Sequence, residues 1–124
     1  MKNAILIVSD PASNSQEALG RLFNALAFAH ESHVAGDEIE IVFKGAGTRW
    51  PAELARLDHP AHGLFQELRE HFKGVSCGCS EVFNARAGAE AAGAPVLTDT
   101  PLPGTPGIAG IRRYFAEGWN VTLF

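Results

Sequence analysis

The sequence has neither a long hydrophobic segment nor an excess of basic residues. Its N-terminal apolar run, 4–8, has five residues, whereas a secretory signal needs roughly 7–15 and a membrane-spanning helix about 20. The net charge is -4, from 10 Lys and Arg residues against 14 Asp and Glu residues. We therefore expect a cytoplasmic protein that binds neither a membrane nor nucleic acid, because no basic excess is present to neutralise phosphates.

Cysteine is scarce as well. The only two cysteines are Cys77 and Cys79, separated by a single residue. A disulfide between them would close too small a loop to restrain the unfolded chain, which excludes a disulfide-stapled scaffold. A strained and labile bond between the two stays open, as do reactive thiols, a metal site and inert buried thiols.

Several motifs of catalytic and cofactor sites are missing. The sequence contains no C-x-x-C, no P-loop and no G-x-G-x-x-G, so thiol redox and nucleotide chemistry are poorly supported. The five histidines are His30, His33, His59, His62 and His71. Because none of them has the local spacing typical of a zinc site, we predict no metal site and no cofactor.

What is present is an alternation of apolar runs with helical patterns over 124 residues, of which 46% are hydrophobic. The predicted strands cover 4–8, 38–43, 75–76, 95–97 and 120–124. The predicted helices cover 14–35, 50–57, 60–73, 80–92 and 106–117. Because parallel strands need helical crossovers, this order predicts a single α/β domain, 1–124, with a five-stranded, mostly parallel sheet and helices on both faces.

Local signals predict two of the helix starts. Ser13, followed three residues later by Gln16, has the pattern of a capping box for the first helix. The pair 105–106, Thr-Pro, predicts the start of the last helix. In that last helix we expect the apolar side chains to face inward; these are Ile108, Ile111 and Phe115.

The loops that follow the strands should meet at one edge of the sheet, where open α/β sheets bind their ligands. These loops cover 9–13, 44–49, 77–79 and 98–105. The candidate site residues on them and on the helix that follows the third loop are Ser9, Asp10, Lys44, Gly45, Cys77, Gly78, Cys79, Arg86 and Thr98. Ser9 and Asp10 either contact a ligand or serve as turn and cap residues.

The two cysteines lie where the third strand gives way to a helix, and a helix N-terminus favours the reactive thiolate. Gly78 between them allows unusual backbone angles and close approach of a ligand. Lys44 is either a cation that stabilises an anion at this site or an ordinary exposed lysine. Arg86 either faces the cysteines or pairs with Glu90, four residues on.

Five stretches resemble the DsrE/DsrF-like proteins, including their small YchN-like members. They are 4–8, 42–43 (the Val-Phe end of the second strand), 75–79 (Val-Ser-Cys-Gly-Cys), 84–88 (Asn-Ala-Arg-Ala-Gly) and 117–121 (Glu-Gly-Trp-Asn-Val). The resemblance implies a flavodoxin-like or Rossmann-like fold that assembles into trimers or hexamers. It also implies a sulfur-relay role, in which the cysteine after the third strand, here Cys77 or Cys79, accepts a persulfide and passes it on.

The leading hypothesis is therefore a sulfurtransferase-like carrier that exchanges sulfur with donor and acceptor proteins. The alternative is a non-enzymatic module whose loop edge binds a small anionic or nucleotide-like molecule, with the cysteines lining the pocket. A third hypothesis is an assembly protein whose loops make only subunit contacts.

Overall fold

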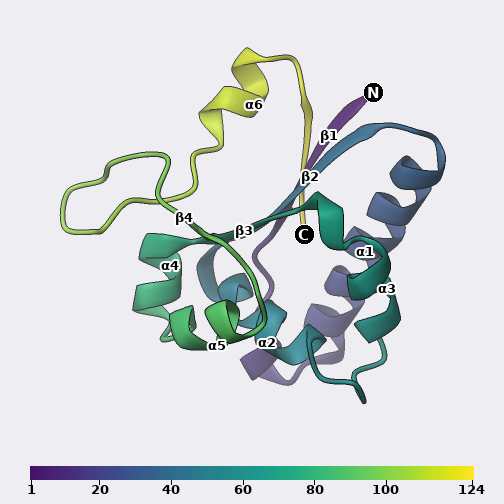
Figure 1. Cartoon of the computed structure of the whole chain (residues 1–124), viewed down its shortest axis with the longest axis horizontal. Helices are drawn as coiled ribbons and strands as arrows, with labels where there is room; N and C mark the ends of the chain where they lie inside the picture. The colour runs from purple at the N-terminus through teal and green to yellow at the C-terminus, as the bar shows by residue number, and fades with distance from the viewer.

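Five parallel strands form one sheet in the computed structural model, which describes all residues from 1 to 124 (Figure 1). The strands are β1 (Lys2–Ile7), β2 (Glu38–Phe43), β3 (Phe72–Ser76), β4 (Val96–Leu97) and β5 (Asn120–Leu123). They lie in the order β4-β3-β2-β1-β5, and every neighbouring pair is parallel. The predicted α/β fold is confirmed, and its sheet is parallel throughout.

The central strand, β1, is the continuous apolar run of the sequence. Its residues 4–7 are all buried, as expected for a parallel strand that is covered on both faces. Ile5 lies opposite Ile41 of β2 and opposite Thr122 of β5. The third strand is longer than predicted because it begins at Phe72, which pairs with Ile41.

All the helices are shorter than predicted, the first by the smallest proportion. They are α1 (Gln16–Val34), α2 (Trp50–Leu54), α3 (His62–Glu67), α4 (Cys77–Val82), α5 (Arg86–Ala91) and α6 (Arg112–Ala116), with single 3-10 turns at η1 (Pro11–Ser13), η2 (Gly45–Arg49) and η3 (Arg69–His71). None of these helices is long and apolar enough to span a lipid bilayer.

The first helix does not begin with the predicted capping box. Its N-cap is Ser15, whose hydroxyl accepts a hydrogen bond from the amide of Ala18 at 3.0 Å. Ser13 instead ends η1, a turn that Asp10 caps by accepting from the amide of Ala12. The intervening 3-10 turn therefore shifts the helix start by two residues.

The predicted last helix, 106–117, is wrong over its first half. Thr100 and Ile108 form an antiparallel bridge, and this extended pairing prevents a helix before Arg112. The shorter α6 presents Tyr114 to the sheet, with 1% of its surface exposed, whereas Ile111 and Phe115 are exposed rather than inward.

Helices cover both faces of the sheet, but unequally. A large core of 16 buried residues joins one face to α1, α2, α3 and α5. A small core of six buried residues joins the other face to Tyr114 and Trp119, around α6, which lies apart from the other helices in Figure 1. Successive side chains alternate between the two cores along β1, with Ile5 and Ile7 in the large core and Leu6 in the small one.

Candidate functional site

The cysteine turn is the start of α4 rather than a loop before it. Cys77 is the first residue of the helix and has 1% of its surface exposed, whereas Cys79 is half-buried. Both thiols are free. Residues two apart on a helix point about 200° away from each other, so the two sulfurs face different surroundings, and a disulfide would require this turn to unwind.

The helix predicted over 80–92 is divided in two. It is interrupted at Asn84, whose φ of 51° lies in the left-handed region, and α5 then begins at Arg86. Asn tolerates this conformation better than most residues. The interruption matters because it gives Arg86 its own position at the head of a second short helix.

Arg86 makes both of the contacts that the sequence left as alternatives. Its Nε donates to Oε1 of Glu90 at 2.8 Å, and its Nη1 donates to Oε1 of Glu81 at 2.9 Å. The same Nη1 lies 3.8 Å from Sγ of Cys77. Hydrogen bonds to Glu90 and Glu81, together with the sulfur of Cys77, raise the pKa of Arg86 above its usual value, so the guanidinium stays positively charged.

Gly78 allows a close approach, and the segment that approaches belongs to this chain. Its amide donates to the carbonyl of Gly107 at 2.8 Å. A Cβ at position 78 would lie 3.0 Å from Cγ2 of Ile108. Thr98 has an exposed side chain, and its backbone packs against Gly107. The loop after β4 therefore covers one side of the cysteine turn.

Lys44 is tied to that covering loop. Its ammonium donates to the carbonyl of Ala109 at 2.5 Å, and the amide of Ala109 donates to Oγ of Ser76 at 3.0 Å. The cation that contacts a cysteine sulfur is therefore Arg86. Gly45, with a φ of 56°, begins η2.

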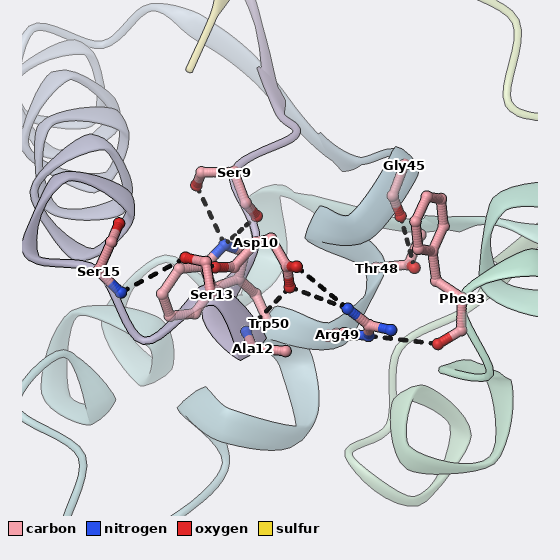
Figure 2. Close-up of polar contacts among 10 residues, drawn as sticks. All are labelled: Ser9, Asp10, Ala12, Ser13, Ser15, Gly45, Thr48, Arg49, Trp50 and Phe83. Atoms are coloured by element: carbon pink, nitrogen blue, oxygen red, sulfur yellow. Dashed lines mark hydrogen bonds and ion pairs between the residues drawn. The ribbon is translucent and has the colours of Figure 1, made fainter.

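Ser9 and Asp10 belong to a network that joins three segments at this edge (Figure 2). The indole of Trp50 donates to the carbonyl of Ser9 at 2.8 Å. Nη1 of Arg49 donates to both carboxylate oxygens of Asp10, at 3.0 and 3.2 Å, and Nε of Arg49 donates to the carbonyl of Phe83 at 3.2 Å. Ser9 and Asp10 thus serve as turn residues that hold the loops together.

Arg49 is the residue at this edge that the sequence analysis missed. Asp10 lies 39 positions before it and Phe83 34 positions after it, so no local spacing signals the contacts. Its neighbour Trp50, beside a glycine-rich loop, is 2% exposed. Only a sheet that brings these loops to one edge reveals the network.

A hollow of about 240 Å³ lies beside the network. It is lined by residues of η1, α1 and α2, including Trp50, and by Ser15 and His59 from the segments beside them, and neither cysteine lines it. A ligand seated there would therefore not touch the cysteine turn.

Comparisons with protein-family models, with curated proteins and with solved structures find no match to this chain. The chemistry of the chain is therefore inferred from the edge of the sheet at which the strands end, called here the carboxyl edge. That edge combines two free thiols at the end of β3, a guanidinium against one of them and a loop that covers their turn. A nucleophilic sulfur is the chemistry for which this arrangement has the parts.

Proposed function

We propose that the chain is a sulfur carrier of the DsrE/DsrF-like type, in which Cys77 holds the transferred sulfur. The observation that carries the proposal is the contact of 3.8 Å between Nη1 of Arg86 and Sγ of Cys77. A positive charge beside a cysteine sulfur stabilises the anionic form, which is the nucleophile. The two carboxylates of Glu81 and Glu90 hold that charge in place.

The transfer balances without an outside oxidant. The thiolate of Cys77 attacks the outer sulfur of a donor persulfide, R–S–SH, and the S–S bond of the donor breaks. The donor leaves as a thiolate with the bonding electron pair, and Cys77 becomes the persulfide. An acceptor thiolate then attacks the outer sulfur and releases Cys77 as a thiolate, by the ordinary course of thiol exchange.

Access to the sulfur is the step that the fold restricts. Cys77 is 1% exposed, so a donor reaches it only when a neighbouring side chain moves. The side chain of Arg86 is 46% exposed and is the neighbour that can move without disturbing either core. Arg86 would then have two roles, admission of the donor and stabilisation of the sulfur anion.

The test is the intact mass of the protein after incubation with a low-molecular-weight persulfide. The wild-type chain should gain one sulfur atom, Cys77→Ser should gain none, and Cys79→Ser, the matched control, should gain one. Arg86→Gln should slow the gain roughly tenfold, because a charge-assisted contact to the sulfur is lost. Circular dichroism of each variant reports whether it is folded.

Two outcomes would count against the proposal. A gain that survives in Cys77→Ser and disappears in Cys79→Ser would move the carrier sulfur to Cys79. No gain in the wild-type chain would remove the sulfur-carrier function altogether. The assembly into trimers or hexamers that the family resemblance implies stays a prediction, which a molar mass from light scattering would check.

A further inference from the structure

A second group of reactive side chains lies at the opposite edge of the sheet, where β2 and β3 begin. His33 is in the last turn of α1, five residues before β2 begins at Glu38. Glu70 and His71 belong to η3, which leads directly into β3. We call these three residues the His33–Glu70–His71 cluster; it joins the end of α1 to the segment after α3, which lies next to α1 in Figure 1.

The ligand atoms of this cluster converge. Nδ1 of His33 lies 2.9 Å from Nε2 of His71. Oε1 of Glu70 lies 3.5 Å from that Nε2 and 3.9 Å from the Nδ1 of His33. Zinc binds nitrogen and oxygen at about 2.0–2.2 Å in a tetrahedral arrangement, which separates two ligand atoms by about 3.3–3.5 Å. The three atoms therefore form a triangle close in size to one face of a zinc tetrahedron.

We infer that the His33–Glu70–His71 cluster binds a Zn²⁺ ion, with the fourth position open to water. Two imidazoles and one carboxylate are a common zinc ligand set. In the metal-free protein one imidazole donates a hydrogen to the other; on binding zinc the donor ring carries that hydrogen on its other nitrogen instead, which frees a second lone pair for the ion. His71 is 15% exposed and Glu70 is 70% exposed, which places the ion at a rim that solvent reaches.

Local sequence motifs do not predict this site. His33 and His71 are 38 positions apart in the sequence, so the prediction of no metal site followed from spacing alone. The parallel sheet brings the two together, because each residue lies shortly before one of two adjacent strands, β2 and β3. The bound ion would link α1 to η3 and would leave the cysteine edge untouched.

Helix α1 also supplies a matched control. His30 lies one turn before His33, and its Nδ1 pairs with Glu67 at 2.8 Å. It shares the helix, the residue type and the kind of partner with His33, but it is outside the cluster. Titration of the 124-residue chain with Zn²⁺ should give about one ion per chain. His33→Asn and His71→Asn should each weaken binding at least tenfold, and His30→Asn should leave it unchanged.

Further measurements separate this site from metal binding elsewhere on the chain. Co²⁺ bound in place of zinc should show visible d–d bands without a thiolate charge-transfer band, since no sulfur is a ligand, and the double variant Cys77→Ser, Cys79→Ser should still bind. Glu70→Gln, at an exposed position, should fold normally and bind several-fold more weakly. Zn²⁺ should also raise the thermal midpoint of the wild-type chain but not that of His33→Asn.

The inference is overturned by binding that depends on the cysteines, by equal affinity in wild type and His33→Asn, or by no binding to the wild-type chain at millimolar Zn²⁺. The persulfide mass test is read at the other edge of the sheet. Failure of one proposal therefore leaves the other standing.

Discussion

The two edges of the sheet are held together in different ways. At the carboxyl edge, long-range hydrogen bonds run mainly from side-chain donors to main-chain oxygens of neighbouring loops, and Arg49 also donates to the carboxylate of Asp10. The donors are Trp50, Arg49 and Lys44. In the half of the sheet nearer to where the strands begin, called here the amino half, side chains form hydrogen bonds with other side chains. The pairs are Asn3 with Ser32, His30 with Glu67, His33 with His71 and Arg113 with Glu40.

This difference separates two kinds of chemistry. Main-chain oxygens do not titrate, so the carboxyl edge, apart from its Arg49–Asp10 pair, keeps its loop shapes and presents the cysteine turn as its main reactive element. Imidazoles and carboxylates do titrate and bind metals, so the amino half is the part of the molecule that should respond to ions and pH. The predictions below test the two halves of this comparison, starting with the largest effect.

The strongest test of the carboxyl edge is Gly47→Ala. A Cβ at position 47 would lie 2.2 Å from the carbonyl oxygen of Ile7 and 3.1 Å from Cα of Val8. Neither main-chain atom can move without displacing the end of the central strand. We expect a loss of about 3 kcal/mol or more in the free energy of unfolding, measured by urea denaturation.

The matched control is Gly20→Ala on α1, where a Cβ would meet nothing within 4 Å. It should stabilise the chain by roughly 0.5–1 kcal/mol, because alanine is the better helix former. If Gly47→Ala were as stable as the wild type, the carboxyl edge would not depend on close main-chain packing.

A smaller effect is expected for Arg49→Ala. The change removes the hydrogen bonds that join Asp10 and the carbonyl of Phe83 to the loop after β2. We expect a loss of about 1–2 kcal/mol, since charged hydrogen bonds at a half-buried position contribute more than exposed pairs. Urea denaturation of Arg21→Ala, which breaks an exposed pair with Glu17 on α1, should show less than about 0.5 kcal/mol. Equal losses in the two variants would contradict a network at this edge.

The fold could be predicted from the sequence wherever the sequence signals are local. The apolar run of β1 and the alternation of strands with helices predict the parallel sheet, and the position of Cys77 after β3 follows from them. The start of α6 was wrong because a contact between Thr100 and Ile108 outweighs the helix-start signal at 105–106. Propensity is a weak guide where tertiary pairing competes with it.

The candidate sites show the same difference between local and long-range signals. Arg86 lies close to Cys77 in sequence, and the sequence analysis named it among the site residues. Arg49 and the pair of His33 and His71 could not be found in this way, since their partners are 34 to 39 positions away. Such contacts follow from the order of strands in the sheet, which no local spacing encodes.

The smallest predicted effect tests the ionic contacts of the amino half. The hydroxyl of Tyr114 donates to the carboxylate of Glu40 at 2.6 Å, and Arg113 bonds to the same carboxylate. Burial alone would raise the pKa of Glu40, but these hydrogen bonds from Tyr114 and Arg113 outweigh it and hold the pKa below its ordinary value. The carboxylate is therefore charged at neutral pH and stabilises the fold there.

Tyr114→Phe keeps the ring and removes one of these hydrogen bonds, so it should cost about 1 kcal/mol at pH 7. Because the folded pKa of Glu40 is lowered, its contribution is complete above the unfolded value of about 4.3 and is lost as pH falls through the folded value. The difference between wild type and Tyr114→Phe in urea denaturation should therefore shrink below about pH 4. The difference between wild type and Gly47→Ala has a steric origin and should stay constant over the same range. A Tyr114→Phe difference that did not change with pH would mean that the amino half, like the carboxyl edge, is held by contacts that do not titrate.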